Sequence, residues 1–141
     1  MNRVLIIEDE YATALPVKEA LSLENVDSDI AKDGEEGLKM FEVGNYDLVL
    51  LDLKMPGLDG EKVLTEIRKL DPFVDVIIYT NYSEFADIKR LTNIGIQGYI
   101  NKGPEANLQE LIDSIMSKIA PMNEEDIAKL IKMTPDEMFD E

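Results

Sequence analysis

The chain has 141 residues, a formal net charge of −16 at pH 7 and neither cysteine nor histidine. Its 30 acidic residues outnumber 14 Lys and Arg, which argues against nucleic acid and against anionic membrane surfaces as partners. The absence of cysteine excludes disulfides and thiolate metal sites and fits a cytoplasmic protein, while the absence of histidine excludes the usual zinc ligand and general base.

The first predicted strand is the unbroken apolar run Val4–Ile7, a pattern typical of strands buried on both faces of a parallel sheet. It ends abruptly in three acids, Glu8, Asp9 and Glu10. Neighbouring carboxylates repel one another. This strand end therefore needs a cation.

A helix is expected next, reaching about residue 23. Pro16 lacks an N–H, which is harmless only in the first turn, so we place the N-cap at Thr13; a helix that starts earlier would be kinked at the proline. The alternating stretch Val26–Ala31 predicts a strand nearer the sheet edge. Asp33 then begins a capping box for a helix to about residue 43.

The central feature is the run Leu48–Leu51, which predicts another fully buried strand, with Asp52 at its end. Open α/β sheets bind their ligands at the carboxyl ends of their strands. The segment Met55–Gly57 supplies turn residues, and Asp59 can cap the next helix. On this segment alone, a turn cap is the better explanation of Asp52, so the case for a functional role must come from other residues.

The rest of the chain continues the alternation of strands and helices. The expected elements are a helix from Asp59 to Leu70, a strand at Val74–Tyr79, a helix from Ser83 to about Asn93, a strand at Gln97–Asn101 and a helix opened by Gly103 and Pro104. Five strand–helix units predict an α/β fold with a doubly wound, five-stranded parallel sheet, whose strand order this pattern leaves open. We expect one domain over residues 1–120 and an acidic helical tail over 121–141, either folded back or docking a partner.

Chemically useful side chains follow four of the predicted strands. Because these ends share one edge of a parallel sheet, the acidic pair Glu8–Asp9 should meet Asp52, Thr80 and Lys102. Carboxylate oxygens suit Mg²⁺, and a hydroxyl and an ammonium suit the oxygens of a transferred phosphoryl group. Each residue alone has an ordinary structural role, but their joint placement indicates a site.

These residues, together with the stretch Asp52–Gly60 and the segment Gly98–Lys102, resemble the receiver domain of bacterial two-component response regulators, the chemotaxis regulators among them. The resemblance covers residues 2–119 and implies the flavodoxin-like strand order 2-1-3-4-5. It also implies a role for each matching residue: Asp52 as phosphoryl acceptor; Asp9, Asp52 and the backbone carbonyl of Lys54 as Mg²⁺ ligands, with Glu8 acting through water; Lys102 on the phosphoryl group; Thr80 and the aromatic Tyr99 as the switch.

Three positions depart from the family pattern. Glu8 stands where Asp is more frequent, so its longer arm could alter the metal geometry. Asn81 is larger than the small residue often found after the switch Thr. Lys102 is followed by Gly103 rather than directly by proline, so we do not expect the cis bond common there.

The leading hypothesis is a phosphorylation-dependent switch served by a sensor histidine kinase or a histidine phosphotransfer protein. It would not be an enzyme apart from its own phosphorylation and slow dephosphorylation. Its output would be contact with a downstream protein or a second copy through the fourth helix, fifth strand and fifth helix. One alternative is a small Mg²⁺-dependent phosphohydrolase, although Lys54 replaces the second acid of an Asp-x-Asp motif. A receiver-like adaptor that is never phosphorylated is another, and a flavin site is disfavoured by the acidic first loop.

Overall fold

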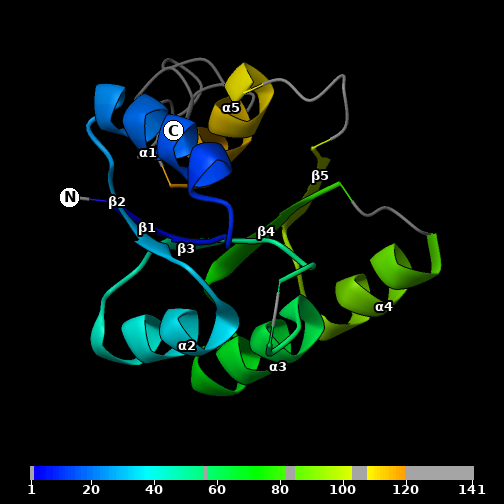
Figure 1. The fold of residues 1–141 in the computed structure, drawn as a ribbon. Coiled ribbons are helices and arrows are strands. Elements are labelled where there is room, and N and C mark those ends of the chain that lie inside the picture. The colour runs from blue at the N-terminus through cyan, green and yellow to red at the C-terminus, as the bar shows by residue number, and fades with distance from the viewer. Residues whose placement is uncertain (1, 56, 82–84, 103–107, 120–141) are drawn as a thin grey trace, which may run out of the picture.

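The computed structural model describes residues 2–55, 57–81, 85–102 and 108–119. Strands and helices alternate along these ranges, as the sequence predicts (Figure 1). The elements are β1 Arg3–Ile7, α1 Tyr11–Leu23, β2 Asp27–Ala31, α2 Gly34–Val43, β3 Leu48–Leu51, α3 Gly60–Leu70, β4 Asp75–Thr80, α4 Phe85–Ile94, β5 Gly98–Asn101 and α5 Leu108–Ile119.

The five strands form one parallel sheet in the order β2-β1-β3-β4-β5. In this register Ile7 pairs with Leu51, Leu51 with Ile78, and Thr80 with Asn101. The ends of β1, β3, β4 and β5 therefore lie next to one another at one edge of the sheet. The doubly wound architecture and the order 2-1-3-4-5 are both confirmed.

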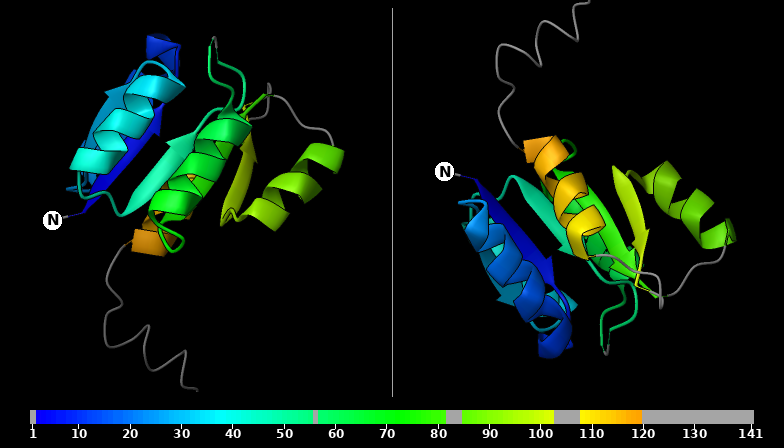
Figure 2. Two further views of the ribbon diagram at one scale, coloured as in Figure 1. Left: turned by 90° about the horizontal axis from the view of Figure 1, so that it is seen from below. Right: turned by 90° about the horizontal axis from the view of Figure 1, so that it is seen from above.

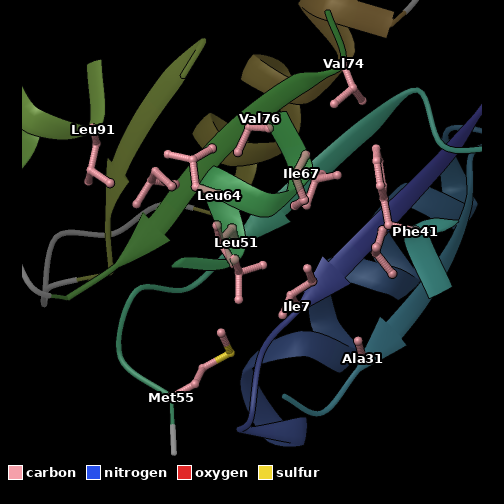
Figure 3. Packing of buried hydrophobic residues seen from close by; sticks show 14 residues of the cluster. Ile7, Ala31, Phe41, Leu51, Met55, Leu64, Ile67, Val74, Val76 and Leu91 are labelled. Carbon is pink, nitrogen blue, oxygen red and sulfur yellow. The ribbon is translucent and has the colours of Figure 1, made fainter. Parts of the chain in front are cut away.

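Two helical layers cover the sheet. Helices α1 and α5 lie on one face, and α2, α3 and α4 lie on the other (Figures 1 and 2). Successive strand residues point to opposite faces: Leu48 and Leu50 pack with α1 and α5, whereas Val49 and Leu51 pack with the other layer. Figure 3 shows the core on this second side, where Leu51 and Ile7 meet Leu64 and other apolar side chains. Burial on both faces is why β1 and β3 are unbroken apolar runs.

Two helix starts were predicted correctly from their caps. The side chain of Asp33 accepts a hydrogen bond from the backbone N–H of Glu36 at 2.8 Å, at the start of α2. The side chain of Asp59 likewise accepts from the N–H of Lys62 at 2.9 Å, at the start of α3. Each bond satisfies a backbone donor that the first turn of a helix leaves free.

The predicted start of α1 at Thr13 is wrong. The helix begins at Tyr11, with Glu10 at the N-cap position and Pro16 inside the helix. The carbonyl of Glu10 accepts hydrogen bonds from the N–H groups of Thr13 and Ala14, at 2.9 and 3.1 Å. The side chains that α1 buries against the sheet recur at helical spacing: Ala14, Val17 and Leu21. Pro16 faces solvent.

The strand bounds differ from the predicted ones by one residue at several ends, because pairing with neighbours sets them. Thus β2 begins at Asp27, β4 ends at Thr80 and β5 begins at Gly98. The expected cap Ser83, the helix start at residues 103–104 and the tail 121–141 lie outside the described residues and stay predictions. Among the residues that are described, no helix is long and apolar enough to cross a membrane.

Candidate functional site

Three charged side chains meet at the carboxyl edge of the sheet. Glu8, Asp52 and Lys102 each follow a strand, and backbone hydrogen bonds extend the ladder to them: Asp52 N–H donates to the carbonyl of Ile7 at 3.1 Å, and Lys102 N–H to that of Thr80 at 2.8 Å. The ammonium of Lys102 forms an ion pair with Glu8 Oε2 and lies 3.3 Å from Asp52 Oδ2. The predicted convergence of β1, β3 and β5 at this edge is observed.

The two carboxylates of this ion-pair group are buried. Glu8 is 4% exposed and Asp52 is 5% exposed, and Lys102 is half-buried between them and solvent. A buried charge is costly unless it is paired. Because one ammonium serves two carboxylates here, the group retains an excess of negative charge.

Burial and the neighbouring charges shift the pKa values of Glu8 and Lys102. Burial, with a further contribution from the nearby charge of Asp52, raises the pKa of Glu8 to about 7, although the hydrogen bond from Lys102 opposes the shift. Burial works to lower the pKa of Lys102, but its hydrogen bond to Glu8 and the charges of Glu8 and Asp52 outweigh this and raise the pKa. The lysine is therefore charged at neutral pH, and Glu8 takes up a proton near neutral pH.

The loop after β3 wraps closely around Asp52. Asp52 Oδ1 accepts a hydrogen bond from the N–H of Lys54 at 3.3 Å, which turns the chain back over the carboxylate. Gly60, the first residue of α3, packs against this loop. A Cβ there would lie 2.6 Å from the Cα of Leu53 and 2.7 Å from the carbonyl oxygen of Asp52, so the close approach requires glycine.

A second group, the acidic cluster, consists of Glu8, Asp9 and Glu10, whose carboxylate oxygens lie within 4.8 Å of one another. Asp9 and Glu10 are exposed. Hard oxygen donors around an opening to solvent suit Mg²⁺, which retains several waters when bound. Glu10 was not among the predicted ligands, although the run of three acids was the signal for it. Glu8 belongs to both groups and links them.

The two predicted switch residues lie on neighbouring strands. Thr80 ends β4 and is completely buried, and Tyr99 in β5 pairs with Ile78. Strand alternation places Thr80 on the side of Val76 and Ile78, which is also the side on which Tyr99 packs. The two side chains therefore share the face covered by α2, α3 and α4.

Sequence reasoning missed Tyr79, which precedes Thr80 and points to the opposite face. Its ring centroid lies 5.4 Å from the ammonium of Lys102. The alternation of β4 could have indicated this side chain, but its contact with a residue of β5 depends on the register between the two strands.

A parallel sheet in the order 2-1-3-4-5 defines a flavodoxin-like α/β domain, and its buried acids and lysine lie at the carboxyl edge, where such sheets bind their ligands. The family model of the response regulator receiver domain matches residues 4–116. The chain belongs to this family, the receiver domains of two-component response regulators. Receiver domains bind Mg²⁺ at their acidic pocket.

Relatives of two kinds match the chain. The uncharacterized transcriptional regulatory protein YkoG of Bacillus subtilis is 35% identical over 118 residues, which are 84% of this chain and 51% of that protein. Sporulation initiation phosphotransferase F of the same organism is 29% identical over 114 residues, covering 81% of this chain and 90% of that protein. The chain thus spans about half the length of YkoG and of several other regulators that it matches.

Solved receiver structures share the fold. The response regulator TrrA of Thermotoga maritima, in complex with Mg²⁺ and BeF, has a TM-score of 0.75 and 36% identity, covering 84% of this chain and all of that one. A CheY-like receiver domain protein of Methanospirillum hungatei has a TM-score of 0.79 and 30% identity, covering 84% of this chain and 93% of that one.

Proposed function

We propose that this receiver domain is a signalling switch that accepts a phosphoryl group on Asp52. The observation that carries the proposal is the position of Asp52, a buried carboxylate at the end of a central strand with the ammonium of Lys102 3.3 Å from one oxygen. The other oxygen accepts the Lys54 N–H, so the side chain is oriented from both ends. A carboxylate held in place beside a cation is oriented to attack phosphorus, and the cation stabilises the negative charge of the phosphoryl group.

The donor would be a phosphohistidine of a sensor kinase or a phosphotransfer protein, because the 141 residues contain no histidine. A carboxylate oxygen of Asp52 attacks phosphorus, the P–N bond breaks, and its electron pair stays on the imidazole, which takes up a proton. Lys102 donates to a phosphoryl oxygen. Attack of water on the acyl phosphate later releases inorganic phosphate and restores the carboxylate. The match to a sporulation phosphotransferase supports phosphotransfer as the chemistry.

Mg²⁺ would be held by Asp9, Asp52 and the backbone carbonyl of Lys54, with Glu8 acting through water. The acidic cluster supports the part of Asp9 and Glu8 in this set, since their carboxylate oxygens lie within 4.8 Å of one another and that of Asp9 is exposed. When bound, the ion supplies positive charge to the phosphoryl oxygens. The chain's own residues orient the acceptor and keep the site partly closed to water.

The output would be a rearrangement on the face that carries Thr80 and Tyr99. A dianionic group on Asp52 would attract the hydroxyl of Thr80, and Tyr99 would turn inward as that side chain moves. The surface that changes would be made by α4, β5 and α5, and it would contact a downstream protein or a second copy of the chain. Thr80→Ala should blunt the change in amide exchange that beryllofluoride causes in β4 and β5, without preventing phosphorylation.

Intact mass spectrometry after incubation with Mg²⁺ and a small phosphodonor tests the acceptor. The wild type should gain the mass of one phosphoryl group, and Asp52→Asn should not. Asp47→Asn is the matched control, because Asp47 precedes the same strand, at its other end, and is exposed. A phosphoryl gain in Asp52→Asn equal to that of the wild type would refute the assignment.

A further inference from the structure

The feature that carries a further inference is Tyr79, next to the last residue of β4. Tyr79 pairs with Ile100 of β5, and both side chains pack on the face covered by α1 and α5. Lys102 lies two residues beyond Ile100, so alternation returns its side chain to that face. The register between β4 and β5 thus places an aromatic ring beside the ammonium of the lysine.

Among the residues that the structure describes, three groups lie around the ammonium of Lys102. The carboxylates of Glu8 and Asp52 contact it on the acidic side, and the ring of Tyr79 lies 5.4 Å away, within the roughly 6 Å over which a cation is attracted to an aromatic face. Tyr79 also lines, together with Glu8 and Asp52, a crevice too narrow to hold a water molecule. The ring is thus part of the wall of the site.

The tyrosine is suited to a neutral role. It is half-buried, and burial raises the pKa of its hydroxyl despite the nearby charge of Lys102. The ring therefore stays uncharged at neutral pH and presents only its π face to the ammonium. Unlike the carboxylates, the aromatic face neither takes up a proton nor binds a metal ion. It can therefore hold Lys102 while Glu8 and Asp52 exchange their contacts with the lysine for contacts with a metal ion or a phosphoryl group.

We infer that Tyr79 is a positioning residue, whose ring holds the ammonium of Lys102 within reach of the oxygens of Asp52. This inference rests on the proposed function, because it assigns Tyr79 to the same phosphoryl-accepting site. A lysine has a long flexible stem and loses conformational entropy when it is ordered. A ring that attracts the ammonium restricts this freedom before the phosphoryl group arrives, which is preorganisation. Tyr79 acts only through Lys102 and contacts no phosphoryl oxygen itself.

The first arm of the test uses NMR of the ligand-free protein. The ε-protons of Lys102, identified by their loss in Lys102→Arg, should show an upfield ring-current shift in the wild type. Tyr79→Phe, which keeps the ring, should retain the shift, and Tyr79→Leu, which keeps apolar volume alone, should abolish it. Tyr79→Met serves as a second ringless variant if the leucine variant does not fold.

The second arm measures the affinity for beryllofluoride in the presence of Mg²⁺. Loss of the ring should weaken binding roughly fivefold, since a cation–π contact at a partly desolvated site has that scale. The phenylalanine variant should bind within about twofold of the wild type on the same scale. Tyr46→Leu is the matched control, because Tyr46 stacks on Arg3, at 4.9 Å, at the other end of the sheet, and its loss should leave the affinity unchanged.

The two arms separate the possible failures. Wild-type affinity and an unchanged Lys102 shift in Tyr79→Leu would overturn the inference. Equal losses in the leucine and phenylalanine variants would also overturn it, because the hydroxyl rather than the ring would then be responsible. A wild type that takes up neither beryllofluoride nor phosphate would overturn the proposed function and any part for Tyr79 in it, whereas the shift measured without ligand would still show whether the ring holds the lysine.

Discussion

Replacing Glu8 with Gln should stabilise the metal-free domain above pH 7. Glu8 is 4% exposed and shares the single ammonium of Lys102 with Asp52. Glutamine keeps the shape and an oxygen that can accept the hydrogen bond from Lys102, but it removes one of the two buried negative charges. The remaining pair, Asp52 and Lys102, is then neutral, which lowers the cost of burying it.

The size of this effect follows from the pKa of Glu8, which burial raises from 4.5 to about 7. The folded chain then binds a proton more tightly than the unfolded chain, so stability is greatest below the unfolded pKa and is lost as pH rises through the folded pKa. At 1.36 kcal/mol per pH unit, the full loss is on the order of 3 kcal/mol. Because Gln does not titrate, the stability advantage of Glu8→Gln should grow by roughly 2 kcal/mol between pH 5 and pH 8.

Urea unfolding in a metal chelator at pH 5, 6, 7 and 8 measures this difference. Glu42→Gln, in which an exposed carboxylate of α2 is replaced, is the control and should differ from the wild type by the same small amount at every pH. If Glu8→Gln is less stable than the wild type at pH 8, or if its advantage does not change with pH, the idea that Glu8 is a costly buried charge is wrong.

Three further changes test other parts of the structure. Gly60→Ala should cost about 1–3 kcal/mol of folding free energy by overpacking, because its Cβ would meet backbone atoms at 2.6 and 2.7 Å; unchanged urea unfolding would contradict the close packing. Mg²⁺ at about ten times its Kd should add about 1.4 kcal/mol of stability by mass action, and Asp9→Ala should reduce this gain in a thermal melt; an equal gain would rule out Asp9 as a ligand. Tyr46→Phe removes a 2.7 Å hydrogen bond to Asp29 and should cost up to about 1 kcal/mol at pH 7. Burial raises the pKa of Asp29, but this bond and the neighbouring Arg3 outweigh burial and lower it. The stability deficit of Tyr46→Phe should therefore close as pH falls through that pKa in acid unfolding. A deficit that persists there would contradict a hydrogen bond to the ionised Asp29.

Several features of this protein could be predicted from local sequence. The strand Leu48–Leu51 was identifiable because a strand buried on both faces must be apolar throughout. The starts of α2 and α3 were identifiable because Asp33 and Asp59 satisfy free N–H groups within three residues. The convergence of Asp52 and Lys102 followed from the parallel topology, since all strands of such a sheet end at one edge.

Tertiary structure decided what local sequence left open. Helix α1 starts before Thr13, with Pro16 inside it, because the carbonyl of Glu10 accepts the N–H groups of the first turn. Lys102 pairs with both Glu8 and Asp52 and lies over the ring of Tyr79. These contacts depend on the register of strands that are far apart in the chain. Such contacts are set by the energy of the whole packed sheet. Periodicity and capping report only on the residues within about one helical turn or one strand.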